Sequence, residues 1–348
     1  MSFGAAVAGL TAPDATAAAE AAALHDRLAK PRGALGRLET VGVRLAAIAG
    51  VCPPPVPAPV VVAVFAGDHG VLAEGVTPWP QEVTAQMVAA FCDGGAAVNV
   101  LARHAGAAVI VVDVGVATDL PSAPGLLLRK VRPGTANLAA GPAMTVDEAR
   151  QALDVGASVA AHAVVGGARC LVTGDMGIGN TTASAALIAA LTGRSAAEVT
   201  GRGTGIDDPT WQRKVSVVER ALARSVLGPL EVLASVGGLE IAALAGFIIG
   251  GASARVPVVV DGVVALAGLM VAAALAPACV DFCVAGHRST EPGATVALEH
   301  LGMDPLLDLG MRLGEGTGAL LAVPLVQAAS KVLREMATLD GAGVTGKG

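Results

Sequence analysis

Aromatic residues are scarce in this chain of 348 residues, which has five Phe, two Trp and no Tyr. Its hydrophobic content of 53% therefore comes mostly from Ala, Val and Leu. An interior of small and branched side chains suits helices and parallel strands. The length predicts one large domain with an appendage, or two domains.

Clustered positive charge is also missing. The chain has 23 Lys and Arg against 29 Asp and Glu, a formal net charge of -6, and no run of more than two consecutive basic residues. Affinity for nucleic acid comes mainly from clustered cations on phosphates. We therefore expect small-molecule partners and no nucleic acid.

No motif for a disulfide framework or a metal site occurs. The cysteines are odd in number and form no CxxC pair; they are Cys52, Cys92, Cys170, Cys279 and Cys283. Asp68 and His69 are adjacent, but no HxH, HExxH or second His/Asp pair completes a ligand set. We expect reduced thiols in a cytoplasmic protein, and neither a metal nor a cofactor.

The uncharged run from Val263 to Val280 reaches the minimum length of a membrane-spanning helix. It is rich in Ala and Gly, Pro277 interrupts it, and Asp261 and Asp281 bracket it. No basic cluster marks one side as cytoplasmic. We expect a helix followed by a buried strand here, and neither a membrane segment nor a signal peptide in the chain.

Short runs rich in β-branched residues alternate with helix-like segments through the middle of the chain. The runs are 59–65, 107–115, 168–174, 256–262 and 278–286. Strands that are apolar throughout belong to a parallel sheet covered by helices on both faces. We predict an α/β fold, a doubly wound, Rossmann-like parallel sheet in three α/β/α layers, with ligands at the carboxyl ends of the strands.

The two ends of the chain have a different pattern. Residues 1–50 and 320–336 show the apolar spacing of amphipathic helices, and the proline-rich segment 51–59 is a stiff linker. We predict a small helical domain made of residues 1–55 and 318–348. Residues 56–317 form the predicted α/β domain.

The segment TGDMGIGNTT follows the third strand run and predicts an anion site. It contains Gly174, Gly177 and Gly179, and then Asn180, Thr181 and Thr182 as candidate N-caps of a helix. Backbone N–H groups at a helix N-terminus bind phosphate, and glycines allow it to approach closely. The segment matches neither a Walker loop nor the GxGxxG fingerprint of dinucleotide-binding proteins. The alternative interpretation is a tight strand-to-helix turn that binds no ligand.

Two later segments are further candidates for a phosphate site. Lys214 follows the glycines of GRGTG and could reach a phosphate from a helix; a solvated surface Lys is the alternative. Ser289 and Thr290 follow a buried strand run and would either meet an anion or cap a helix.

The rigid turn TPWPQ holds Trp79 between two prolines. Trp79 and the following Val83, Gln86 and Met87 would form the wall of a flat apolar pocket for an aromatic ring. A Trp that packs under a loop is the alternative interpretation.

Glu315 lies among glycines and apolar residues in RLGEGTG. Burial among apolar groups raises the pKa of a carboxyl towards neutrality, as a general base requires. An ordinary turn with a solvated Glu is the alternative.

Six segments in the same order resemble the nicotinate-nucleotide:dimethylbenzimidazole phosphoribosyltransferases of cobalamin biosynthesis. They are KPRGALGRLE, FAGDHGVLAEGVTPWPQEVTAQM, FCDGGAAVNVLAR, TGDMGIGNTTASAAL, VDGVVALAGLMVA and HLGMDPLLDLGMRLGEGTGALLAVPLVQAA. The resemblance runs from Lys30 to Ala329 and rests on the ordered set of motifs.

The resemblance implies an enzyme, a homodimer without a metal or cofactor. It would transfer the phosphoribosyl group of nicotinate mononucleotide to 5,6-dimethylbenzimidazole with inversion, giving α-ribazole 5'-phosphate and nicotinate. The α/β domain would then be the phosphoribosyltransferase domain.

The family's functional residues carry over to named positions of this sequence. Glu315 is the implied base that deprotonates the incoming substrate. The implied phosphate and ribose contacts are Gly174, Asp175, Gly177, Asn180, Thr181, Gly203, Lys214, Asp261 and Ser289. The implied base pocket is formed by Pro80, Gln86, Met87, Met176 and Leu313. Relatives often have Glu at Asp175, so this shorter carboxylate would contact the nucleotide differently, or through water.

Other functions stay open at this point. A related phosphoribosyltransferase could act on adenine, another benzimidazole or a phenol, because apolar pockets discriminate weakly between ring substituents. A non-catalytic nucleotide-binding protein could share the fold, although the presence of both Glu315 and Lys214 favours catalysis. A dinucleotide oxidoreductase would need a glycine pattern and a ribose-binding acid that are missing.

Overall fold

The computed structural model describes residues 1–224 and 227–343, and a parallel sheet of six strands forms the centre of this part. The strands are β1 (Val60–Gly67), β2 (Ala107–Gly115), β3 (Leu126–Leu128), β4 (Cys170–Met176), β5 (Val258–Val260) and β6 (Cys283–Ala285). Their order across the sheet is β3-β2-β1-β4-β5-β6. The predicted doubly wound α/β fold is therefore confirmed.

Helices make up most of the remaining structure. The α-helices are α1 (Phe3–Gly9), α2 (Ala15–Arg27), α3 (Arg37–Ala49), α4 (Glu82–Cys92), α5 (Ala97–Ala105), α6 (Val146–Val165), α7 (Asn180–Thr192), α8 (Ala196–Val199), α9 (Asp208–Leu222), α10 (Pro229–Val236), α11 (Leu239–Ser253), α12 (Val263–Leu275), α13 (Pro292–Leu301) and α14 (Thr317–Glu335). Two 3-10 helices, η1 (Gly70–Glu74) and η2 (Pro277–Phe282), follow β1 and precede β6.

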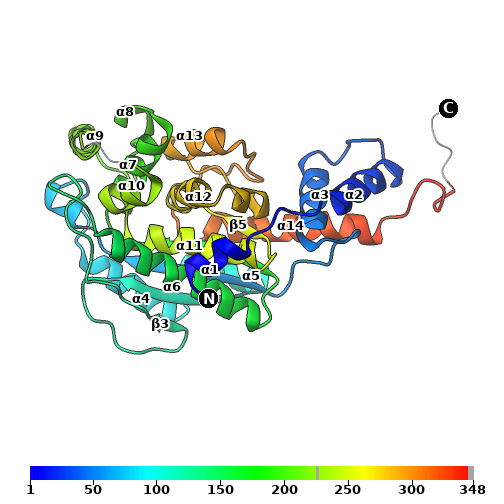
Figure 1. The fold of residues 1–348 in the computed structure, drawn as a ribbon, viewed down its shortest axis with the longest axis horizontal. Coiled ribbons are helices and arrows are strands. Elements are labelled where there is room, and N and C mark those ends of the chain that lie inside the picture. Colours follow the sequence, from blue (N-terminus) through cyan, green and yellow to red (C-terminus); the bar gives the residue numbers. More distant parts are fainter. Residues whose placement is uncertain (225–226, 344–348) are drawn as a thin grey trace.

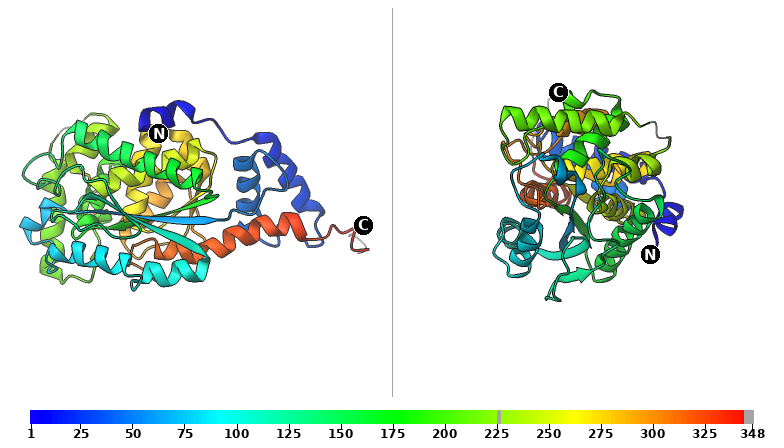
Figure 2. Two further views of the ribbon diagram at one scale, coloured as in Figure 1. Left: turned by 90° about the horizontal axis from the view of Figure 1, so that it is seen from below. Right: turned by 90° about the vertical axis from the view of Figure 1, so that its left-hand side faces the viewer.

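The two faces of the sheet pack into separate hydrophobic cores. Phe65 and Leu171 belong to the core shared with α6, α7, α11 and α12, and the Phe65 ring meets Phe247 of α11 edge-on at 5.4 Å. Val64 and Val172 belong to the core shared with α4, α5 and α14. Figure 2 shows the sheet between these helical layers. Because both faces are covered, the central strands are mostly apolar, and Thr173 and Asp175 of β4 are buried exceptions.

The edges of the sheet differ from the sequence prediction. The run 278–286 was expected to be one strand, but its first half is η2, which begins at Pro277, and β6 starts only at Cys283. Proline is favoured in a first helical turn because its missing N–H is not needed there. The edge strand β3 was not predicted, because three leucines are too few for a periodic pattern.

Helices α2 and α3 and the end of α14 project from one end of the molecule (Figure 1). A small apolar cluster joins them, with Ala21, Ala46 and Leu333 among its members. The first half of α14 lies on the sheet, and α1 packs on α6 and α11. The division into two domains stays a prediction, and residues 344–348 of the predicted helical domain lie outside the described residues.

The stretch Glu82–Ala105 is long and apolar enough, by composition, to cross a membrane. It is divided in the structure, because α4 ends at Cys92, Gly94 has a φ of +78° and α5 begins at Ala97. The uncharged run after Asp261 forms α12, which is buried in the core. Both stretches therefore pack as parts of the α/β layers.

Glycines allow α6 and α11 to pack in close contact. A Cβ added at Gly156 of α6 would lie 1.8 Å from the carbonyl oxygen of Ala243, and one at Gly246 of α11 would lie 2.0 Å from that of Leu153. Any side chain at these positions would push the two helices apart. The close packing of α6 on α11, on one face of the sheet, therefore depends on these two glycines.

We expect Gly156→Ala to lower the free energy of unfolding by about 1–3 kcal/mol, the usual cost of overpacking, despite the better helix propensity of Ala. Gly4→Ala in α1 is the matched control, because nothing lies within 4 Å of a Cβ at Gly4. It should leave stability unchanged or raise it by up to about 1 kcal/mol. Urea denaturation measures both; equal effects in the two variants would contradict the packing argument.

Candidate active site

The candidate site lies where the strand order reverses, at the carboxyl ends of β1 and β4. Chains leave neighbouring strands there towards opposite faces, which opens a crevice between the loops. His69 follows β1, Gly177 follows β4, Asp261 follows β5 and His287 follows β6. The sheet topology thus brings together polar segments that are far apart in the sequence.

A cavity of about 330 Å³ occupies this position. Of the predicted site residues, it is lined by Met87, Asp175, Met176, Gly177, Asn180, Thr181, Gly203, Lys214, Leu313 and Glu315. Two of the three predicted anion segments, the two glycine loops, therefore meet the predicted base in one cavity.

Lys214 and Thr181 form one end of this cavity. Lys214, on α9, is 2% exposed, and its Nζ donates to Thr181 Oγ1 at 2.8 Å and to the Gly201 carbonyl at 3.2 Å. Burial lowers the pKa of Lys214 to about 8, and nearby Glu291 opposes the shift. A solvated surface Lys is excluded, and a buried cation beside a helix N-terminus is suited to an anion.

The loop after β4 leads directly into α7. Gly179, with a φ of +94°, is the N-cap, so Asn180, Thr181 and Thr182 are first-turn residues and the N-cap prediction was wrong by one residue. Asn180 instead donates from Nδ2 to Asp175 Oδ2 at 3.0 Å. Burial raises the pKa of Asp175 well above its ordinary value, and the Asp261, Glu240 and Glu315 carboxylates add to this effect.

Glu315 is buried, which excludes the solvated turn. Its Oε2 accepts a hydrogen bond at 3.1 Å from the backbone N–H of Val98, in the first turn of α5. Burial raises the pKa of Glu315, the Val98 N–H opposes the rise, and the Asp261 carboxylate adds to it. The result is a carboxyl that is held by one donor and suited to accept a proton.

Apolar side chains complete the cavity wall. Val83 and Met87 lie one turn apart on α4 and both face the cavity, with Trp79 beside them. Trp79 is 49% exposed, so it lines the cavity mouth and is not packed under a loop. Leu313 is 58% exposed and also borders the mouth.

Five predicted contacts lie outside the cavity wall. Pro80 and Gln86 are exposed, and Gln86 is on the solvent side of α4, because only positions one turn apart share the cavity face. Gly174 instead packs against the Glu315 loop, since a Cβ there would lie 2.6 Å from the Glu315 carbonyl oxygen. Asp261 and Ser289 are buried behind the wall.

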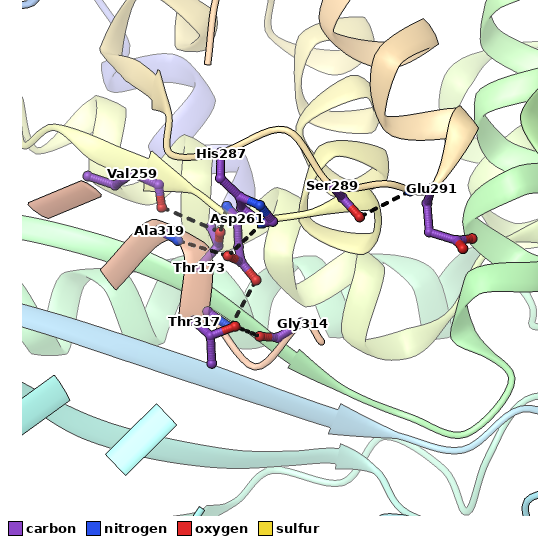
Figure 3. Close-up of polar contacts among 10 residues, drawn as sticks. Thr173, Val259, Asp261, His287, Ser289, Glu291, Gly314, Thr317 and Ala319 are labelled. Atoms are coloured by element: carbon purple, nitrogen blue, oxygen red, sulfur yellow. Dashed lines mark hydrogen bonds and ion pairs between the residues drawn. The ribbon is translucent and has the colours of Figure 1, made fainter. Parts of the chain in front are cut away.

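Ser289 belongs to a short polar segment after β6. The backbone N–H of Glu291 donates to its Oγ at 3.3 Å, as Figure 3 shows. Glu291 in turn accepts a hydrogen bond at 2.7 Å from the N–H of Gly203, which lines the cavity. Glu291 was not predicted from the sequence, although it stands only two residues after Ser289.

Arg312 and the pair His69–Glu240 were also missed. Arg312 lines the cavity and donates to the Gly203 carbonyl at 2.7 Å, so it joins the Glu315 loop to the second glycine loop. His69 Nε2 lies 2.7 Å from Glu240 Oε1, and both side chains are fully buried under the loop after β4. No sequence motif marked Glu240 as a site residue, because it is the single charged residue of the apolar helix α11.

The part of the chain that the structure describes contains no set of side chains that could together bind a metal ion. No group of three or more His, Cys, Asp or Glu is placed to hold a metal ion among residues 1–224 and 227–343. The free thiols include Cys170 and Cys283, which are buried.

Comparison with known proteins identifies the family. A family model described as "Phosphoribosyltransferase" matches residues 10–344. A protein of Salinispora tropica named nicotinate-nucleotide–dimethylbenzimidazole phosphoribosyltransferase is 58% identical, over 96% of each chain. A protein of the same name from Chloroflexus aggregans is 55% identical, over 96% of this chain and 95% of its own.

A solved structure supports the same assignment. The crystal structure of CobT from Thermus thermophilus is 53% identical and superposes with a TM-score of 0.93, covering 95% of this chain and all of that one. With the family model and the curated relatives, this likeness extends over nearly the whole chain. The chain belongs to the family of nicotinate-nucleotide–dimethylbenzimidazole phosphoribosyltransferases.

Proposed function

We propose that this chain transfers the phosphoribosyl group of nicotinate mononucleotide to 5,6-dimethylbenzimidazole, in the lower-ligand branch of cobalamin biosynthesis. The products are α-ribazole 5'-phosphate and nicotinate. The observation that carries the proposal is one cavity lined by a buried cation, Lys214, by a buried carboxyl with a raised pKa, Glu315, and by the apolar side chains of α4. The names of the relatives support the choice of both substrates.

The phosphate of nicotinate mononucleotide is assigned to the Lys214 end of the cavity. Thr181, Gly177 and the N-terminus of α7 supply a hydroxyl and backbone N–H groups around it. Gly203 lines the same end and permits close approach. Ser289 lies behind this loop and supports it through Glu291.

The reaction needs one proton acceptor and firm positioning. A ring nitrogen of the benzimidazole attacks the anomeric carbon, with inversion, while Glu315 takes the proton from the other ring nitrogen. The bond from the anomeric carbon to the pyridinium nitrogen breaks, and its electron pair neutralises nicotinate's ring, which makes nicotinate a good leaving group. Positioning of the two substrates supplies several kcal/mol, and a general base about 10²–10⁴-fold in rate.

The choice of base depends on the apolar wall. Val83, Met87 and Trp79 offer flat contact but few polar groups. Incubating the protein with nicotinate mononucleotide and a panel of benzimidazoles, adenine and phenols, and measuring released nicotinate, tests this part of the proposal. Faster release with adenine or a phenol than with dimethylbenzimidazole would replace the proposed substrate.

A homodimer, which the family resemblance implies, and a cytoplasmic location, which the cysteine pattern indicates, belong to the same proposal. Light scattering during gel filtration should give about twice the chain mass of 34.0 kDa. A mass of one chain at assay concentrations would contradict the dimer.

Replacing Glu315 by Gln should lower kcat by about 10²–10⁴-fold, because the general base is lost. Gln keeps an oxygen that can accept the Val98 N–H, so α5 and the cavity should be preserved. Calorimetric titration should find nicotinate mononucleotide binding as in the wild type. Glu299→Gln, an exposed Glu of α13, is the control. Turnover of Glu315→Gln within a few-fold of wild type would refute the general-base role.

The affinity for nicotinate mononucleotide should fall as the pH rises through about 8, because Lys214 loses its charge there. Below this pH the buried ammonium is charged and holds the phosphate; above it, the dissociation constant should rise about tenfold per pH unit. Lys214→Met should bind about 10- to 100-fold more weakly near pH 7, as expected for a lost charged hydrogen bond.

The pH dependence should also disappear in Lys214→Met. Titration calorimetry between pH 6.5 and about pH 9.5 measures both variants over the range in which Lys214 changes its charge. An equal fall in affinity in Lys214→Met would assign the pH dependence to another group.

A further inference from the structure

Asp261 is a fully buried carboxylate that touches the chain on both sides of the start of α14. Its Oδ2 accepts a hydrogen bond from the Gly316 N–H at 3.1 Å, and its Oδ1 accepts one from the Ala319 N–H at 2.9 Å. Figure 3 shows Asp261 between His287 and Thr317, the first residue of α14. Gly316 is the N-cap of α14 and has no side chain, so Asp261, from the end of β5, caps this helix in its place.

Glu315 stands directly before this capped turn in an unusual backbone conformation. Its φ is +62°, and Gly314 and Gly316 have φ values of +82° and +92°. A residue with a side chain disfavours this left-handed region of backbone conformation. Asn and Asp offset the cost with a local hydrogen bond from their short side chains, but the longer Glu side chain does not. Such a conformation persists only where the surroundings hold it.

The surroundings hold the Glu315 segment from two sides. The end of β4 packs against it at Gly174, where any side chain would collide with the Glu315 carbonyl. Asp261 holds it from the other side, and Thr173 of β4 accepts the Asp261 N–H at 3.0 Å, which joins β4, β5 and α14. We propose that Asp261 is a positioning residue that holds Glu315 in its left-handed conformation, with the carboxylate directed into the cavity.

Asp261 acts through Glu315 and not on the substrate. It does not line the cavity and is 0% exposed, so a bound nucleotide would meet the wall residues first. His287, from the end of β6, lies on its other side, with Nε2 at 3.3 Å from Asp261 Oδ1. Asp261 thus connects the ends of β5 and β6 to the start of α14. In this proposal it is a structural support for Glu315, and not the substrate contact that the family resemblance implied.

The charge of Asp261 also bears on Glu315. The groups that face Glu315 are the Asp261 carboxylate at the end of β5, the Asp175 carboxylate of β4 and the Val98 N–H of α5; His287 faces Asp261. Burial raises the pKa of Glu315, and the negative charge of Asp261 raises it further. A neutral residue at position 261 should therefore lower the pKa of Glu315.

The test compares Asp261→Asn and Asp261→Glu with the wild type; it rests on the proposed function, in which Glu315 is the base. Asp261→Asn should lower kcat about 10- to 100-fold, as expected for a misplaced catalytic group, and leave KM for nicotinate mononucleotide near its wild-type value. The acidic limb of its pH–kcat profile should move to lower pH. Asp261→Glu retains the charge, so it should lower kcat without moving that limb.

Asp113→Asn is the matched control. Asp113 is a buried carboxylate at the end of β2 that accepts the Val116 N–H at 2.9 Å, outside the cavity wall. It should leave kcat and the pH profile unchanged. A raised KM with normal kcat in Asp261→Asn would make Asp261 a substrate contact and overturn the proposal. The proposal would also be overturned if Asp261→Asn had the kcat of the wild type and the acidic limb of its pH–kcat profile stayed at the wild-type pH.

Hydrogen exchange separates this proposal from the function on which it rests. The amides of the segment 314–320 should exchange faster in Asp261→Asn than in wild type, while those of Glu315→Gln should not. If Glu315→Gln keeps wild-type turnover, the general-base role fails, and exchange alone then decides the positioning role. Unchanged exchange in Asp261→Asn would overturn it. If Asp261→Asn does not fold, the same two measurements are made on Asp261→Glu. We then expect a lower kcat and faster amide exchange in the segment 314–320 than in the wild type.

Discussion

The burial of charged groups at the carboxyl edge of the sheet is the constraint on which this structure depends. Asp175, Lys214, Asp261 and Glu315 are each at most 6% exposed. Removing a charge from water costs free energy unless a partner or a change of protonation compensates. The pKa of Lys214 is therefore lowered and those of Asp175 and Glu315 are raised. The same burial that opposes folding brings these groups towards the protonation states that acid–base chemistry needs.

Helix N-termini compensate for part of this cost. The first turn of α5 donates to Glu315, and the first turn of α14 donates to Asp261. The N-terminus of α7 lines the cavity beside Lys214. N-terminal N–H groups carry partial positive charge, so they stabilise carboxylates and bound anions without bringing further side chains into the site. Three helices from different parts of the chain thus set the electrostatics of one cavity.

Glycines determine how closely these elements approach. Gly174 leaves room for the Glu315 backbone against β4, and Gly156 and Gly246 let α6 lie against α11. A chain with so few aromatic residues fills its interior by close backbone contact rather than by large side chains. The abundance of Ala and Gly, which resembles a membrane or low-complexity bias in the sequence, serves close packing here.

The sequence by itself determined the fold class, because apolar strand runs and helical periodicity are local patterns that require a covered parallel sheet. It also located the glycine loops and Glu315, but the role of Glu315 as the base came from the ordered family motifs, because a turn of this kind also fits a solvated Glu. Only the tertiary structure decided which side chains face the cavity. Gln86 and Met87 are neighbours in the sequence, yet the helix turns one to solvent and the other inward. Asp261 took its place as the cap of α14 because β5 ends beside that helix, a contact between residues 55 positions apart that no local pattern encodes.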